Sequence, residues 1–101
     1  MSYTDRNGKT HETVRSLMEA NGFHFEPQMG GGCTAYSLII KEGEEHYLVT
    51  ITDGGMAPDG FFDACYVGHY ADAEDEGTYT DVSNVMEAIA LVCYGDRTAQ
   101  V

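Results

Sequence analysis

Two strand-like runs separated by a polar turn constrain the fold of this chain more than any other feature. Residues 35–41 (AYSLIIK) and 46–52 (HYLVTIT) are rich in aromatic and β-branched residues, and residues 42–45 (EGEE) lie between them. This pattern predicts an antiparallel β-hairpin. One face of the second run is more apolar than the other, which is typical of an antiparallel sheet that packs on helices on one side and faces water on the other.

An amphipathic helix is predicted before the hairpin, over residues 11–21. Its apolar stripe, at helical spacing, consists of Val14, Leu17 and Met18. We expect Thr10 to cap its N-terminus. Gly22 can adopt positive φ and is expected to end the helix in a Schellman motif, in which Phe23 folds back on the last turn.

A second amphipathic helix is predicted near the C-terminus. We expect Thr80 or Asp81 to cap it and Gly95 to end it. Its apolar stripe consists of Val82, Val85, Met86, Ile89, Ala90 and Cys93.

Residues 23–26 and 61–71 add two further predicted strands, with Gly68 as a possible β-bulge. The predicted order is therefore α-β-β-β-β-α in a single domain, residues 1–101. Short connections favour a sequential meander. We predict an α+β fold: a two-layer sandwich in which a four-stranded antiparallel meander carries two helices on one face.

Charge is distributed unevenly along the chain. The net charge is −12, and residues 42–96 contain 13 carboxylates but no Lys or Arg, whereas residues 1–41 contain four residues of each sign. Ordinary surfaces mix the two signs. The acidity disfavours direct binding to nucleic acid or to anionic lipid, and it favours a basic protein partner.

Several expectations about the cellular context follow from composition. The chain has no apolar run near the ~20 residues of a membrane span and does not begin with the apolar segment of a secretory signal. We expect a protein of the cytoplasm of a host bacterium. The charge repels self-association and favours a monomer, with a dimer through a free sheet edge as the alternative.

Candidate metal ligands are present but weakly patterned. His24, His46 and His69 fall on three predicted strands and would hold zinc only if they shared one face. Residues 72–77 (DAEDEG) imitate the first half of a calcium loop, but Ser83 occupies the position of its bidentate glutamate. We therefore expect no metal and no cofactor.

Nucleophilic catalysis is not favoured either. Cys33, Cys65 and Cys93 form no disulfide framework and lie in apolar segments, so we expect buried free thiols. An acidic surface disfavours the thiolate that a reactive cysteine needs. We predict that the protein is not an enzyme.

The acidic segments are the candidate binding site. In an extended strand, alternate residues project to one side about 6.8 Å apart, which is comparable to alternate phosphates at ~3.4 Å per nucleotide. Arginine binds carboxylate and phosphate through the same pair of hydrogen bonds. The candidate partner-binding residues are Glu42, Glu44, Glu45, Asp72, Glu74, Asp75, Glu76 and Tyr79.

The segment YSLIIKEGEEHYLVTIT (36–52), preceded by an amphipathic helix, resembles the helix-then-hairpin core of anti-CRISPR proteins. These are small acidic inhibitors from phages and mobile elements, and the resemblance covers residues 10–52. It implies a non-enzymatic inhibitor that mimics nucleic acid and occupies the DNA-binding surface of a CRISPR effector. The alternatives are an immunity protein against a nuclease toxin, a histidine-based metal-binding domain, and a structural domain with an acidic surface.

Overall fold

The computed structural model describes most of the chain. The described ranges are residues 2–27, 31–41, 45–51, 55–70 and 76–96, and within them the side chains of residues 40–41 and 45–51 are not described. None of the helices in this part of the chain is long and apolar enough to cross a membrane.

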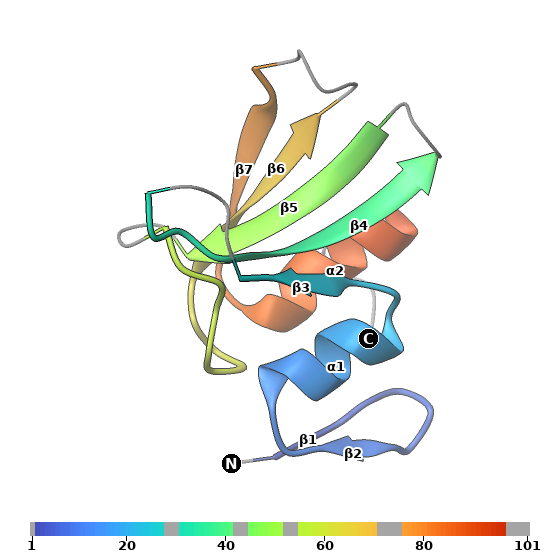
Figure 1. Cartoon of the computed structure of the whole chain (residues 1–101). Helices are drawn as coiled ribbons and strands as arrows, with labels where there is room; N and C mark the ends of the chain where they lie inside the picture. The colour runs from blue at the N-terminus through green and yellow to red at the C-terminus, as the bar shows by residue number, and fades with distance from the viewer. Residues whose placement is uncertain (1, 28–30, 42–44, 52–54, 71–75, 97–101) are drawn as a thin grey trace.

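The fold is α+β, as predicted, and the described residues form two helices and two antiparallel sheets (Figure 1). Its elements are β1 (Tyr3–Thr4), β2 (Thr10–His11), α1 (Val14–Ala20), β3 (His24–Glu26), β4 (Ala35–Lys41), β5 (Glu45–Ile51), β6 (Cys65–Tyr70), β7 (Thr78–Val82) and α2 (Val85–Tyr94). Strands β3 to β7 form one meander in chain order, and β1 pairs with β2 in a separate ribbon.

The predicted number of four strands is wrong, because two strand regions were missed. The ribbon β1–β2 closes around Asn7 and Gly8, a residue pair that favours hairpin turns. Residues 78–82, of which the prediction assigned only 80–82 to the start of the second helix, pair with β6 as the edge strand β7. The alternating, β-branched sequence TYTDV suits a strand better than a helix.

Both helices consequently begin later than predicted. Thr13, not Thr10, caps α1 by accepting a hydrogen bond from the Ser16 amide. Asn84 caps α2 by accepting one from the Glu87 amide, at 2.9 Å. In both cases the earlier candidate is part of a strand, where its backbone is already paired.

The predicted helix ends are confirmed. After α1, the Phe23 amide donates to the Met18 carbonyl and the Gly22 amide to the Glu19 carbonyl, which is the Schellman pattern. Gly22 and Gly95 both have positive φ, at 90° and 70°. The β-bulge predicted at Gly68 is absent, because pairing is regular there; the register shift lies instead between Ile39 and Lys41.

One apolar core lies between the sheet and the helices. In Figure 1 both helices lie beneath the five-stranded sheet; α2 packs on β6 and β7, and α1 packs on β3. The largest fully buried hydrophobic side chains are Phe23, Leu17, Met18, Ile89, Val14, Val85, Pro58 and Cys65.

Candidate interaction surface

The acidic segments between the strands begin and end at one end of the sheet. Successive strands of a meander run in opposite directions, so alternate connections lie at the same end. The register shows this directly, because Lys41 pairs with Glu45 and, nearby, His69 pairs with Thr78. The β4–β5 and β6–β7 connections therefore start and finish at this end, which we call the acidic end. The β5–β6 connection, which contains Asp59, lies at the opposite end.

Most predicted partner-binding residues lie outside the described side chains. These residues are Glu42, Glu44, Glu45, Asp72, Glu74 and Asp75. The structure describes Glu76 and Tyr79, and both are exposed. Tyr79 keeps 59% of its surface accessible, which is unusual for a large aromatic side chain.

Tyr79, on β7, is held in place by contacts with Tyr70 and Gly68 on the neighbouring strand β6. Its ring packs edge-on against Tyr70, with centroids 6.0 Å apart and planes at 88°, and the two hydroxyls hydrogen-bond to each other. Each ring covers a glycine: Tyr79 lies over Gly68 and Tyr70 over Gly77. Sequence reasoning treated Gly68 as a bulge and so missed this role.

Tyr79 projects from the face of the sheet that points away from the helices. A continuous row of cross-strand partners connects His24, Ser37, Leu48, Gly68 and Tyr79. Cys65 and Val67, which alternate with Gly68, are buried against the helices. Ile39, on the Tyr79 face, is 62% exposed, so this face presents apolar surface beside the acidic end.

The three-histidine metal site is contradicted by the register. His24 is in the same row as Gly68, so His69, the next residue, projects from the opposite face of the sheet. The side chain of His46 lies outside the described residues. Among the described residues no group of three or more His, Cys, Asp or Glu is arranged to hold a metal ion. Most of the calcium-like segment 72–77 lies outside them.

The cysteines are free, but only one is buried. Cys65 is fully buried, whereas Cys33 is half-buried and Cys93 is exposed, so the prediction of three buried thiols is wrong for these two. Burial, together with the smaller effect of the nearby Asp63 and Glu87 carboxylates, raises the pKa of the Cys65 thiol to about 12. Burial also raises the pKa of Cys93. Neither thiol has the low pKa of a reactive nucleophile.

A buried polar network near the N-terminus was not predicted. His11 is 1% exposed; its Nε2 lies 2.8 Å from Asp5 Oδ2 and its Nδ1 lies 2.8 Å from Ser16 Oγ. The hydrogen bond from His11 lowers the pKa of Asp5, and backbone hydrogen bonds from Lys9 and Asn7 lower it further. This network joins the β1–β2 ribbon to α1. No pattern in the sequence links Asp5, His11 and Ser16, so the sequence alone gives no signal for this network.

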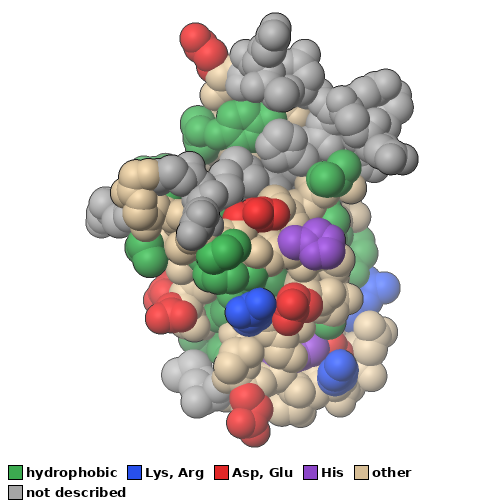
Figure 2. Space-filling view, in the orientation of Figure 1, with side chains coloured by type: hydrophobic (Ala, Val, Ile, Leu, Met, Phe, Trp, Pro, Cys, Tyr) green, Lys and Arg blue, Asp and Glu red, His purple; other side chains and the backbone are tan. Residues whose placement is uncertain are grey.

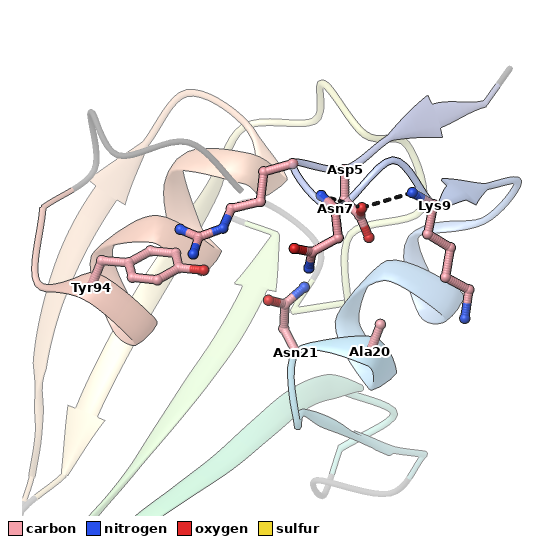
Figure 3. A pocket seen from close by; sticks show the side chains of 7 residues that line it. Asp5, Asn7, Lys9, Ala20, Asn21 and Tyr94 are labelled. Carbon is pink, nitrogen blue, oxygen red and sulfur yellow. Dashed lines mark hydrogen bonds between the residues drawn. The ribbon is translucent and has the colours of Figure 1, made fainter.

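A hollow of about 340 Å³ lies beside this network (Figure 3). Asn7 and Asn21 face each other across it, and Tyr94 forms its other wall. The guanidinium carbon of Arg6 stands 5.0 Å from the centre of the Tyr94 ring, a cation–π contact. The Asp5 carboxylate, which also lines the hollow, is already occupied by the hydrogen bonds described above.

Charges of both signs occur on the part of the surface around α1 and β3. Figure 2 shows blue and red side chains interspersed with hydrophobic ones over the middle and lower part of this face. Arg15 lies over the Phe25 ring at 4.9 Å and approaches Glu19 at 3.8 Å. The cations of residues 1–41 belong mainly to the ribbon and α1. The charge-balanced part of the sequence therefore corresponds to one region of the fold.

Comparison of the chain with protein-family models, with curated proteins and with solved structures finds no match.

Proposed function

We propose that the protein is a non-enzymatic inhibitor that binds the basic, nucleic-acid-binding site of a larger protein. The observation that carries this proposal is the position of the two cation-free connections. Both depart from one end of the sheet, and the exposed ring of Tyr79 stands on the strand that leads away from it. Carboxylates would pair with the arginines and lysines of the target, which normally bind phosphate.

Tyr70 and Tyr79 give the proposed surface an aromatic contact, which carboxylates alone do not supply. Exposed carboxylates mainly accelerate association and select partners of opposite charge, whereas buried aromatic anchors provide most of the affinity. Tyr79 is oriented by Tyr70 and Gly68 before any partner arrives. Such preorganisation reduces the entropy lost on binding.

The resemblance to anti-CRISPR proteins makes a CRISPR effector with its guide RNA the first target to test. The experiment is a competition assay, in which labelled target DNA is displaced from the effector by this protein at several salt concentrations. We expect mutually exclusive binding that weakens as salt rises, because the contacts are charge-assisted. Simultaneous binding of DNA and the protein to one effector would contradict the proposal.

Two variants with equal loss of charge localise the effect. Replacing Glu42, Glu44 and Glu45 by Gln should weaken binding by at least about tenfold. Replacing Glu12, Glu19 and Glu26 by Gln removes the same charge away from the acidic end and should change binding little. Equal effects of the two variants would mean that only net charge matters.

A further inference from the structure

A second surface, at the end of the sheet opposite the acidic end, forms a groove with an aromatic floor. Two adjoining hollows of about 370 Å³ and 340 Å³ share Phe25, Tyr36 and Asp59 as lining residues. These volumes are at the lower end of the range for small-ligand sites. The rings of Phe25 and Tyr36 pack together, with centroids 5.4 Å apart.

The Tyr36 hydroxyl is the polar group at the floor of this groove. Tyr36 is only 4% exposed, yet no group in the described part of the chain hydrogen-bonds its hydroxyl. The described residues also contain no fully buried side-chain oxygen that lacks a partner. The hydroxyl oxygen is therefore reached by solvent, and the groove that Tyr36 lines gives that access.

Charged side chains of both signs lie near Tyr36 in the first hollow. Arg15 and Asp59 both line the first hollow, and both act electrostatically on the Tyr36 hydroxyl. Glu12 lines the same hollow. Neither the Asp59 nor the Glu12 carboxylate has a cationic or hydrogen-bonding partner among the described residues. Arg15 lies over the Phe25 ring and has only a long charged contact, to Glu19, with both of these charged side chains more than half exposed.

The second hollow is largely apolar. Its walls include Met56, Ala57 and Pro58, next to the Phe25 ring. Met56 is 42% exposed, and its flexible thioether can adjust to different apolar shapes. A ligand that fills both hollows must therefore combine a polar head of mixed charge with an apolar group.

We propose that this groove binds an α-amino acid with an apolar side chain, as the zwitterion. The ammonium group would be held by Asp59 and Glu12 and the carboxylate by Arg15, with the Tyr36 hydroxyl between them. The side chain would lie over Phe25 in the second hollow. A purely cationic ligand would meet Arg15 unpaired, and a purely anionic ligand would meet two carboxylates. The site is independent of the proposed inhibitor function, because it lies at the other end of the sheet.

The test is an NMR titration of the full-length, isotope-labelled protein, in which changes in the amide chemical shifts report binding. The probes are L-phenylalanine, its N-acetyl derivative, its carboxamide, and glycine. L-phenylalanine should give saturable shifts centred on Arg15, Tyr36 and Asp59. Removing either charge of the ligand should weaken binding by about tenfold, because a charge-assisted hydrogen bond is lost. Glycine, which leaves the apolar hollow empty, should also bind more weakly.

Variants with matched controls check the assignment of each group. Asp59→Asn and Arg15→Gln should each weaken phenylalanine binding by about tenfold, and Tyr36→Phe should weaken it severalfold while retaining the ring. Asp81→Asn and Arg6→Gln remove the same charges at exposed sites away from the groove and should bind phenylalanine as the unaltered protein does. Far-UV circular dichroism confirms that each variant folds.

Three results would overturn the proposal. Binding of the carboxamide as tightly as phenylalanine would identify a simple cation site. Equal binding of the N-acetyl derivative would identify an anion site. Shifts that do not saturate, or that are equally reduced in the control variants, would mean that the groove is not a specific site at all.

Discussion

The ring of Tyr79 lies over Gly68, its cross-strand partner on β6. A Cβ atom at position 68 would stand 2.9 Å from Cε1 of Tyr79 and 3.2 Å from Cε2 of Tyr70. The absence of a side chain at Gly68 therefore allows both rings to pack and their hydroxyls to meet. A residue in the interior of a strand thus determines how an exposed aromatic side chain is presented.

Gly68→Ala should displace the Tyr79 ring at a small cost in stability. The ring is mostly exposed and can rotate away, so we expect a loss of about 1 kcal/mol or less in the free energy of unfolding. Urea denaturation followed by tyrosine fluorescence measures this, since the chain has no Trp. In the Tyr79→Ala background the same substitution should cost less. Additive costs in this double-mutant cycle would show that the two residues do not interact.

Ser16→Ala should destabilise the fold through His11. The substitution removes the partner of His11 Nδ1, and that nitrogen belongs to a residue that is 1% exposed. An unsatisfied buried polar group costs about 1–3 kcal/mol. Ser83→Ala, at an exposed serine, is the control in the same denaturation assay. If the two variants are equally stable, the network contributes nothing to the fold.

Asn84→Ala should shorten or weaken α2. The Asn84 side chain accepts the Glu87 amide hydrogen bond at the first turn, and loss of such a cap costs about 1 kcal/mol. Thermal unfolding followed by circular dichroism measures the change. Asn7→Ala, in the exposed ribbon turn, should leave the melting temperature nearly unchanged. A similar loss in both variants would indicate a general effect of removing an amide.

Cys65 should be inert to thiol reagents in the native protein at neutral pH. Its side chain is buried and its pKa is raised to about 12, so no thiolate is available. Two thiols, Cys33 and Cys93, should react with a disulfide reagent in buffer, and all three in denaturant. Reaction of three thiols in the native state would contradict the burial of Cys65.

The raised pKa of the Cys65 thiol predicts that the protein loses stability at alkaline pH. The pKa of Cys65 is higher in the folded chain than its ordinary value of 9.0, so the native state favours the protonated thiol. The resulting stability is complete below pH 9 and is lost as the pH rises through about 12. Unfolding free energies measured across this range should fall less steeply for Cys65→Ser than for the unaltered chain. Parallel slopes would mean that other groups cause the loss.

Some local structure was predictable because it depends on neighbours in the sequence. The Schellman end of α1 follows from Gly22 after an apolar stripe, and the β4–β5 hairpin follows from its two alternating runs. The start of α2 was misplaced because Thr80 and Asp81 are good caps locally. Pairing with β6 overrides this preference, and Asn84 becomes the cap.

By itself, the sequence determined the α+β class and the separation of a cation-free segment from a charge-balanced one. Both depend on composition and on short-range periodicity, and neither of these depends on which strands pair with each other. Only the tertiary structure decided that Tyr79 lies over Gly68, that His24 and His69 lie on opposite faces, and that Arg15 and Asp59 line one groove. The physical reason is that strand alternation repeats every two residues and fits several registers equally well. The packing of the apolar face against the helices selects one register, and this register positions every residue on the other face.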